Sequence, residues 1–502
     1  MTDTITGHAV STDPWFQRSY TPESVRSYAD RVAPGWHVAH KPEGKGSFGS
    51  RIDATAQSLD QLYVILDARP VPTYLPGEKL DPLLELRQNP RLLRSVVVEL
   101  STVRKKLGRL PRVIREHGND EPRIVTVADA YLQATGSEYN ADAIQVFIKR
   151  VQEYDALELQ ELWALAPVMK FLLLEEVITQ ANEILADEDA HTETGAELLK
   201  TRMRSLRDIG YADWFTMIEP LVVYDPVLQQ DPVNAYKFMD FDSREAYRKR
   251  VAEIARYSDC TEMEVAQAAL RLALESKEKQ RVEDPRLRAR RAHVGYYIID
   301  RGFPILASRV GYRPRFIDHL RQTIWNNADD FYIGGIQIIT VVLIGLILAP
   351  LVPTYPIFGG LTLAFLLLLL PVTQGAVDLV NNTVTAIFKA YALPKLDFSK
   401  GVPQAFTTLV VVPALLMKEK QVRELFDDLE VRYLANQDPN IHFGLLTDLP
   451  DSVTRPRQND TDPLVDLAIQ LTDELNERYE NAGAGSFFLL HRHRIFNARQ
   501  GV

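Results

Sequence analysis

Two long stretches without charge are the strongest pattern in the chain. Residues 333–352 carry no charged side chain, and a second uncharged stretch, 357–377, includes the run LTLAFLLLLL. About twenty apolar residues cross the hydrocarbon core of a bilayer, and a helix satisfies its own backbone hydrogen bonds there. The link PTYPIFGG is uncharged and too short to fold by itself. The pattern predicts two membrane spans joined by a tight turn; the alternative is a pair of buried core helices in a large soluble protein.

Basic residues around these two runs predict their orientation. They precede the first run and follow the second, and the link between the runs has none: Arg313, Arg315, Arg321, Lys389, Lys395 and Lys400. Because positive charge is retained on the cytoplasmic side, both ends are expected inside the cell and the turn outside. Asp378, Asn381 and Asn382 follow the second run. They are expected to face an interfacial or protein-lined environment, or to belong to an amphipathic helix at the membrane surface.

Residues 83–279 have a mainly helical pattern. Ile144, Phe147, Ile148 and Val151 recur at the spacing that places them on one face of a helix. This periodicity predicts a helix packed against a protein core.

The run LQELWALAPVMKFLLLEEVI in this region is more apolar, but Lys170, Glu175 and Glu176 interrupt it. It therefore predicts a buried core helix, bent near Pro167, rather than a membrane span. A further helix is expected to begin at Asp231-Pro232, with Asp231 as its cap and Pro232 in its first turn.

Residues 1–82 predict an N-terminal segment and a linker. They combine an amphipathic stretch near 59–66, a glycine-serine turn region at 44–50, and four prolines that disfavour helix: Pro70, Pro72, Pro76 and Pro82. The strongly basic run at 281–291 has two interpretations. It is either a solvated helix face or a contact with the anionic headgroups of a cytoplasmic leaflet.

After residue 400 the pattern changes to alternating strands and helices. TTLVVV (407–412) predicts a parallel strand that ends at Pro413 and is covered on both faces, and IHFGLLTD and FFLLH predict two more. The intervening helices carry apolar faces: Val422, Leu425, Phe426 and Leu429 on the first, and Leu464, Leu467, Leu471 and Leu475 on the second, which Asp462-Pro463 caps. This order is typical of a doubly wound parallel sheet.

Ligands of such sheets bind beyond the carboxyl ends of the strands, which are here 413–416 and 447–451. The candidate nucleotide-sugar-binding residues are therefore Pro413, Thr447, Asp448 and Asp451. Strand-end aspartates also cap turns and helices, and that interpretation stays open. The basic cluster 491–494 is either a phosphate contact or a solvated loop. No G-x-G-x-x-G and no G-x-x-x-x-G-K-[ST] follows the first strand, which disfavours a dinucleotide or P-loop site.

Composition limits the function classes. The formal net charge of -10 disfavours a nucleic-acid-binding protein, because phosphate affinity requires a basic face. The single cysteine, Cys260, allows no intrachain disulfide and no cysteine-cluster metal site. The polar start MTDTITGHAVSTDPWF lacks the basic and apolar regions of a secretory signal, so the N-terminal portion is expected in the cytoplasm.

Several segments resemble one family. LVVVPALL and LEVRYLANQDPNIHFGLLTDLPD resemble the opening of the glycosyltransferase domain of cyclic β-1,2-glucan synthases. LELQELWALAPVMKFLLLEEV, DPVNAYKFMDFDSREAYRKRVAEIARYS, HVGYYIIDRG and LPKLDFSKGVPQ resemble segments of the same family, in order, from about Arg109 onward. With the patterns above, the resemblance implies a multidomain protein: an N-terminal segment and linker (1–82), a mainly α-helical cytoplasmic region (83–330), a two-helix transmembrane hairpin with a trailing interfacial helix (331–390), and the beginning of an α/β nucleotide-sugar transferase (GT-A-like) domain (401–502).

The resemblance also implies a function. Such enzymes of the bacterial inner membrane use UDP-glucose to build a β-1,2-linked glucan on themselves and close it into a ring, and they need Mg²⁺ or Mn²⁺. Pro413 and the Thr447-Asp448 pair occupy places where related transferases approach the nucleotide. The metal ligands, the catalytic base and the acceptor site are expected beyond Val502, so the chain alone is expected to be inactive.

The implied partners are UDP-glucose, the growing glucan and the lipid bilayer, with no nucleic acid. The alternative function is a non-catalytic, membrane-anchored helical scaffold. A third alternative is a different membrane enzyme, such as a transporter-coupled hydrolase. The sequence contains neither G-x-S-x-G nor H-E-x-x-H, so no motif supports it.

Overall fold

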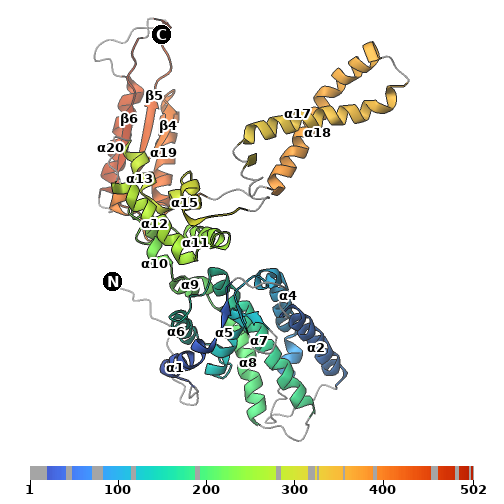
Figure 1. Cartoon of the computed structure of the whole chain (residues 1–502). Helices are drawn as coiled ribbons and strands as arrows, with labels where there is room; N and C mark the ends of the chain where they lie inside the picture. Colours follow the sequence, from blue (N-terminus) through green and yellow to red (C-terminus); the bar gives the residue numbers. More distant parts are fainter. Residues whose placement is uncertain are drawn as a thin grey trace. The chain divides into compact units, whose positions relative to one another are not determined.

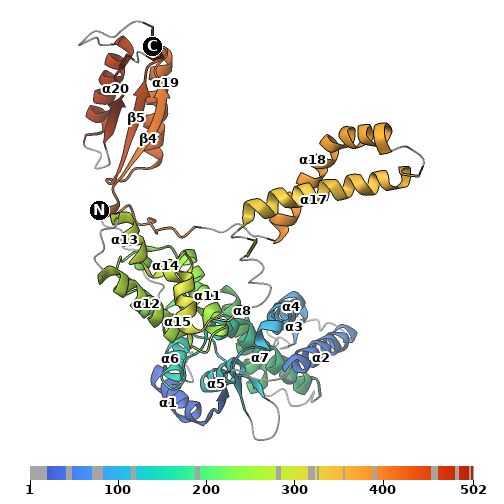
Figure 2. The ribbon, with the colours of Figure 1, turned by 45° about the horizontal axis from the view of Figure 1, so that its top comes forward.

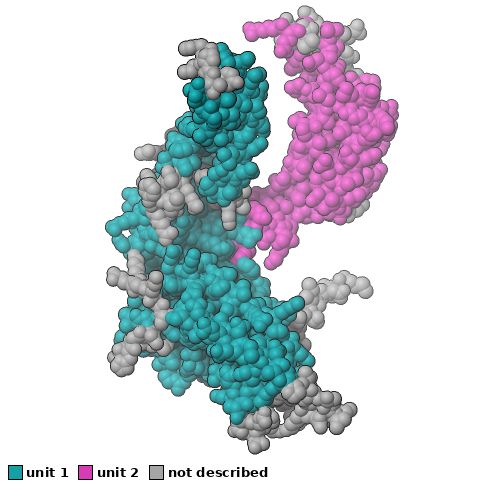
Figure 3. Space-filling model, turned by 90° about the vertical axis from the view of Figure 1, so that its right-hand side faces the viewer, with its two compact units in different colours: residues 1–237, 242–393 teal, residues 238–241, 394–502 magenta. Residues whose placement is uncertain are grey.

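The computed structural model of the chain (Figure 1) describes residues 20–40, 48–69, 83–114, 120–186, 193–278, 284–314, 323–324, 327–353, 357–387, 393–453, 462–480, 486–496 and 499–500. The chain divides into two compact units (Figure 3). The first comprises Met1–Lys237 and Asp242–Leu393, and the second comprises Phe238–Phe241 and Pro394–Val502. The prolines of the predicted linker, Arg315, Arg321 and Lys389 lie outside the described residues.

The first unit is mostly helical. Its helices before the apolar hairpin are α1 (Pro22–Val32), α2 (Phe48–Ala68), α3 (Leu84–Gln88), α4 (Pro90–Leu107), α5 (Arg123–Thr135), α6 (Ala141–Gln152), α7 (Leu159–Ala186), α8 (Glu193–Tyr211), α9 (Trp214–Ile218), α10 (Asp225–Leu228), α11 (Phe241–Arg256), α12 (Glu262–Glu278), α13 (Pro285–Arg291), α14 (Val294–Ile298) and α15 (Phe303–Val310). Short 3₁₀ turns cover Ala33–Gly35, Glu219–Leu221 and Tyr236–Phe238, and the strands β1 (Val38–Ala39), β2 (Arg112–Val113) and β3 (Glu121–Pro122) form a small antiparallel sheet.

Helix α7 is the centre of this unit, as its apolar pattern predicts. It packs against α2, α4, α5, α8 and α9 and continues through Pro167 to Ala186. The charged residues of the run pair with residues of neighbouring helices. Lys170 Nζ donates to Glu99 of α4 at 2.9 Å, and Glu175 accepts from Arg51 of α2. The predicted face of α6 is also confirmed, because Ile144, Phe147, Ile148 and Val151 are all buried.

The predicted helix start at Asp231 is wrong. Residues after Asp231 form turns, and the next α-helix, α11, begins at Phe241. The buried Asp231 carboxylate instead accepts from Val294 N at 3.0 Å and lies 2.8 Å from His293 Nδ1. It also accepts from Ala235 N at 2.9 Å. The Asp231 side chain thus joins segments that are more than sixty residues apart in the sequence. A capping rule considers only residues next to Asp231 in the sequence, so it cannot predict hydrogen bonds to such distant residues.

The two apolar runs form the helices α17 (Ala328–Leu348) and α18 (Thr362–Ile387), which pack side by side (Figure 1). They are flanked by a 3₁₀ turn at Ala349–Leu351 and a π turn at Ile357–Leu361. The Tyr332 hydroxyl donates to Asn381 Oδ1 at 2.8 Å, and α18 continues through its polar residues as one helix.

Both helices are long and apolar enough to cross a membrane, and among the described residues no other helix is. Their most apolar windows are only 17% and 11% buried. A pair of core helices in a soluble protein would bury these surfaces. The exposure therefore favours the membrane interpretation over the soluble alternative.

The second unit contains a parallel sheet of β4 (Thr408–Leu415), β5 (Ile441–Asp448) and β6 (Phe487–His491) in the order β4-β5-β6. Helix α19 (Glu419–Ala435) connects β4 to β5, and α20 (Pro463–Tyr479) connects β5 to β6. A 3₁₀ turn at Gln404–Phe406 precedes β4. As predicted, Asp462 caps α20 by accepting from Leu464 N at 3.0 Å. The core of this unit lies between the helices and one sheet face.

Two predictions about β4 are wrong. The strand does not end at Pro413 but continues to Leu415, pairing Pro413 with Leu446 of β5. Proline is tolerated because β4 is the edge strand, where one side needs no donor. Nor is the sheet covered on both faces: Leu409, Leu446 and Phe488 are 43%, 47% and 44% exposed.

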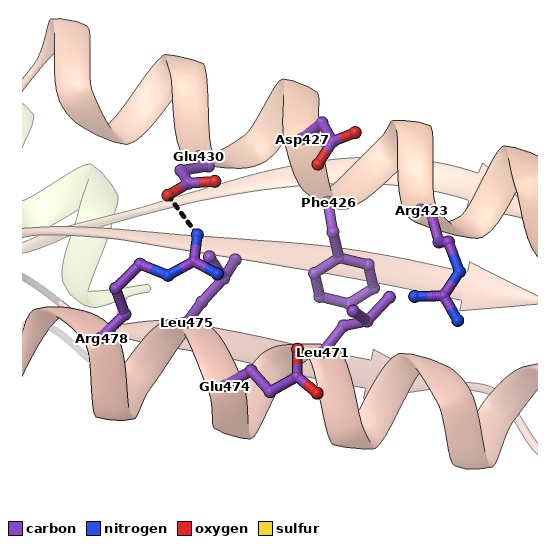
Figure 4. Close-up of a pocket in the computed structure, with 8 residues that line it drawn as sticks. All are labelled: Arg423, Phe426, Asp427, Glu430, Leu471, Glu474, Leu475 and Arg478. Atoms are coloured by element: carbon purple, nitrogen blue, oxygen red, sulfur yellow. Dashed lines mark hydrogen bonds and ion pairs between the residues drawn. The ribbon is translucent and has the colours of Figure 1, made fainter.

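The cause of the open face is topological. Crossovers between parallel strands share one hand, so two steps in the same direction across the sheet place both helices on one face. Helices α19 and α20 contact each other, and the strands pass behind both of them (Figure 4). The described part of this unit therefore has two layers, the sheet and the pair of helices, and is not doubly wound.

Candidate functional site

A hollow of about 350 Å³ lies at the carboxyl end of the parallel sheet. Its lining comes from the last residues of β4 and β5 and from the segment after β6: Pro413, Ala414, Leu415, Leu446, Thr447, Asp448 and Arg492. Three of the four residues predicted from the sequence are in this lining. The hollow is at the strand edge where ligands of parallel sheets bind.

Pro413 and Leu446 face each other across the pairing of β4 and β5. Side chains alternate between the two faces of a strand, so these residues share the open face with Leu415, which pairs with Asp448. Leu415 and Leu446 are 48% and 47% exposed. The floor of the hollow is therefore apolar, and it ends at the Asp448 carboxylate.

Asp448 is held by two partners. Its Oδ1 accepts from Leu449 N at 2.9 Å, which is the local capping role that strand-end aspartates often have. Its Oδ2 forms an ion pair with Nη2 of Arg492. The Asp448 side chain is 31% exposed and that of Arg492 is 77% exposed, so both polar groups remain open to solvent and to a ligand.

Thr447 has a different orientation from its neighbour. It is 1% exposed, and its Oγ1 lies 3.0 Å from His491 Nδ1. By strand alternation its side chain is on the helix-covered side, so it supports the wall rather than presenting a hydroxyl to the hollow. Burial is the main cause that lowers the pKa of His491, and the neighbouring His493 lowers it further. The ring is therefore neutral at neutral pH.

The fourth predicted residue, Asp451, is not brought to the site. It is exposed, lies beyond the end of β5 and is absent from the lining of the hollow. In its place the structure brings Arg492, whose backbone N donates to Thr447 O at 3.0 Å. Arg494 donates to Pro450 O at 2.6 Å, so the basic cluster crosses the end of β5. Sequence reasoning left the role of this cluster open; the parallel pairing of β5 and β6 is the signal that brings the two segments together.

The chemistry of this edge suits recognition rather than bond cleavage. An apolar floor accepts a flat ring, one carboxylate accepts hydrogen bonds, and one guanidinium presents donors in the planar arrangement that fits phosphate. Among the described residues no group of three or more His, Cys, Asp or Glu side chains is placed to hold a metal ion. Asp448 alone does not make a metal site.

A second, smaller hollow of about 160 Å³ lies between α19 and α20 (Figure 4). Its charged residues are largely paired: Arg478 Nη1 lies 2.8 Å from Glu430 Oε1, which also accepts from the Tyr479 hydroxyl at 2.6 Å. The bond from Tyr479, followed by those from Arg478, lowers the pKa of Glu430. These pairs hold the two helices together across the hollow. The strand-edge hollow is therefore the better candidate site.

Comparison with known proteins supports the resemblance seen in the sequence. The chain is 28% identical over 460 residues to the cyclic beta-(1,2)-glucan synthase NdvB of Rhizobium meliloti (strain 1021). The alignment covers 76% of the chain. The chain is a distant relative of this glucan synthase. No family model matches it.

The relationship to NdvB is partial in length. The alignment covers 16% of NdvB, so the chain corresponds to a small part of that protein. NdvB is named as a glucan synthase, and the comparison identifies no residue in the strand-edge hollow. The role of Pro413, Thr447 and Asp448 therefore has to be argued from geometry.

Proposed function

We propose that this chain is part of a membrane-bound glycosyltransferase that polymerises glucose from UDP-glucose into cyclic β-1,2-glucan. In this proposal β4, β5 and β6 are the first strands of a GT-A-like fold, and their carboxyl edge approaches the nucleotide of the donor. The hollow at that edge, with its apolar floor and its Asp448–Arg492 rim, is the observation that carries the proposal. The relationship to NdvB, which is named as a cyclic β-1,2-glucan synthase, supports the proposed product.

The side chains of the hollow match the parts of a nucleoside diphosphate sugar. Pro413, Leu415 and Leu446 offer apolar surface on which the uracil ring can pack. Asp448 keeps acceptor capacity for a ribose hydroxyl or a ring N–H, because each carboxylate oxygen can accept more than one hydrogen bond. Arg492 is the exposed cation nearest to it and suits the diphosphate.

Thr447 acts as a positioning residue in this arrangement. Its bond to His491 fixes the ends of β5 and β6 relative to each other, and Asp448 and Arg492 are the next residues of the same two segments. The neutral state of His491 matters, because a second cation beside Arg492 would repel it. Asp451 is assigned no contact with the donor, because it is outside the lining of the hollow.

The family resemblance implies Mg²⁺ or Mn²⁺, which neutralises the diphosphate leaving group when bound. The described residues of this chain do not fit such a metal, because Asp448 is the one carboxylate in the hollow and is engaged by Arg492 and Leu449 N. We therefore derive no step through the metal. Its ligands and the catalytic base are proposed to lie in residues other than those of this hollow, so the chain by itself should bind donor and not polymerise it.

The apolar hairpin supports a membrane location for the chain. We propose that α17 and α18 span the bacterial inner membrane, with the helical region and the α/β sheet in the cytoplasm where UDP-glucose is made available. The exposed apolar surfaces of the two helices support this placement. The basic flanks support its direction.

Equilibrium dialysis of the detergent-solubilised chain against radiolabelled UDP-glucose tests the proposal. We expect saturable binding that UDP displaces and ADP-glucose at the same concentration does not, because the two compounds share the diphosphate and only UDP carries the uracil ring. Incubation with UDP-glucose should yield no glucan. Absence of saturable binding would favour the non-catalytic scaffold, and glucan formed by the chain alone would refute the assignment of the catalytic groups elsewhere.

A further inference from the structure

The arginine-rich helix α13 differs in charge from the rest of the chain. Residues 284–314 contain seven arginines and two acidic residues, whereas the whole chain has a formal charge of -10. Four of the arginines are on α13 itself, and every residue of this helix is exposed. Asp284 caps it by accepting from Arg286 N at 2.9 Å, so its helical form is defined at the first turn.

The order of residues on α13 places an apolar side chain inside an arc of arginines. Leu287 is 46% exposed and is flanked in sequence by Arg286 and Arg288. Residues four apart lie one turn above each other, so Arg290 is above Arg286 and Arg291 is above Leu287. Leu287 therefore lies in the middle of the charged arc rather than on the side that meets the neighbouring helices.

An ion pair of Arg290 holds α13 to the helical module. Arg290 forms a bidentate ion pair with Asp300, with Nε to Oδ2 at 2.7 Å and Nη2 to Oδ1 at 2.9 Å. This pair braces α13 against the loop before α15 and neutralises one of the positive charges. Helix α13 also packs on α12 and α14, and α14 packs on α15 (Figure 2). The arc is thus presented on a rigid support.

We infer that the α13 arc, Arg286–Leu287–Arg288–Arg291, docks on the anionic phospholipid headgroups of the membrane that holds α17 and α18. The inference rests on the membrane placement in the proposed function. Exposed arginines complement a negative leaflet, and an apolar side chain among them inserts at the headgroup level while the guanidinium groups stay in contact with phosphate.

Chain length makes the contact feasible. Seventeen residues separate Val310, the end of α15, from Ala328, the start of α17. Fully extended, such a segment reaches at most about 60 Å, so the module carrying α13 is confined near the bilayer surface. Confinement raises the effective concentration of headgroups around α13, so that individually weak contacts are sufficient. A soluble anionic polymer would lack this advantage.

Fluorescence quenching in vesicles tests the inference. The chain has a single cysteine, Cys260, so a Cys260→Ser background allows one label at a time. Leu287→Cys carries a fluorophore in the reconstituted full chain, and a nitroxide on the phosphatidylcholine headgroup is the quencher. We expect severalfold more quenching in vesicles with phosphatidylglycerol than in phosphatidylcholine alone, and high salt should abolish the difference because it screens exposed charges.

Matched variants test whether the charge of α13 itself, rather than any loss of positive charge from the chain, causes the quenching. Arg286→Gln, Arg288→Gln and Arg291→Gln together should remove the phosphatidylglycerol-dependent quenching. Lys105→Gln, Lys106→Gln and Arg109→Gln, which remove three exposed cations at the end of α4, should leave it unchanged. A label at Tyr211→Cys, 88% exposed at the end of α8, should show no dependence on lipid charge.

A label at Leu367→Cys on α18 reports insertion of the hairpin through quenching by brominated acyl chains. If Leu367→Cys is quenched and Leu287→Cys is not, or if neutral lipid quenches the latter equally, docking of α13 is refuted while the membrane placement stands. If Leu367→Cys is not quenched either, the membrane placement itself fails and the inference fails with it.

Discussion

The Thr447 hydroxyl lies 3.0 Å from Nδ1 of His491 and thereby joins the carboxyl ends of β5 and β6. This bond holds the two residues that follow, Asp448 and Arg492, close enough to form their ion pair. The strand-edge hollow thus depends on a contact between segments that are 44 residues apart in the sequence.

The first prediction concerns pH. Burial, assisted by His493, lowers the pKa of His491 below its ordinary value of 6.5 in the folded chain. Protonation therefore favours the unfolded state: the stability of this edge is intact above pH 6.5 and is lost as the pH falls through the lowered pKa.

Hydrogen exchange of the β5 and β6 amides, compared at about pH 8 and about pH 5 after correction for intrinsic rates, measures the effect. The wild-type chain should lose protection at the lower pH, and His491→Gln should lose less. Equal loss in both proteins would contradict the assignment to His491.

The second prediction concerns donor binding. Arg492→Gln removes the cation that lines the hollow and should weaken UDP-glucose binding by about tenfold, because a charge-assisted hydrogen bond is worth roughly 1.5 to 3 kcal/mol. Arg494→Gln is the matched control. Arg494 belongs to the same basic cluster but donates to Pro450 O and is outside the lining of the hollow. Similar losses in the two variants would show that the cluster acts through its overall charge and not through Arg492.

The sequence predicted much of the local structure around this site. The apolar runs predicted β5 and β6 correctly, and the Asp462-Pro463 pair predicted the cap of α20, since each depends on neighbours within a few residues. It did not predict that β4 passes through Pro413, because whether a strand is at an edge depends on sheet order. It left the role of Arg492 open within the basic cluster 491–494, because the place of this residue in the hollow comes from the pairing of β5 with β6.

The error at Asp231 has the same origin. The Asp-Pro pair has the form of a helix start, but the carboxylate is used by Val294 N and His293, which only tertiary structure brings near. Similarly, the covering of the sheet was predicted from apolar strands alone. The direction of the two crossovers, which decides which face the helices cover, is not encoded in any one strand.

The third prediction concerns the stability of the helical region. Arg123 and Glu161 are 1% and 0% exposed, and Arg123 Nε donates to Glu161 Oε1 at 2.9 Å. Replacing Arg123 with Met leaves the Glu161 carboxylate buried without its counter-charge, which should cost about 3 to 5 kcal/mol of unfolding free energy.

Arg104→Met provides the comparison, because Arg104 pairs with Asp53 at an exposed site where both side chains are about half exposed. This variant should cost about 0 to 1 kcal/mol. Denaturant unfolding followed by far-ultraviolet circular dichroism measures both. Comparable costs would indicate that the Arg123–Glu161 pair contributes no more than a surface ion pair.

The fourth prediction concerns the orientation of the hairpin. In the Cys260→Ser background, a cysteine at Val352, next to the turn, should react with a membrane-impermeant maleimide added to spheroplasts. A cysteine at Ile469, 48% exposed on α20, should react only after the membrane is permeabilised. Both ends of the hairpin carry the basic residues, so the turn is expected outside. Protection of Val352→Cys together with labelling of Ile469→Cys in spheroplasts that have not been permeabilised would show the opposite topology.

Photo-crosslinking with 5-azido-UDP-glucose, followed by mass-spectrometric mapping of the modified peptide, tests the central claim most directly. The account predicts that the label is found on the strand ends around Pro413–Leu415 or Leu446–Asp448, that excess UDP prevents it, and that Arg492→Gln reduces it. Labelling confined to the helical region, or labelling that UDP does not suppress, would contradict the claim that the carboxyl edge of β4, β5 and β6 is the donor site.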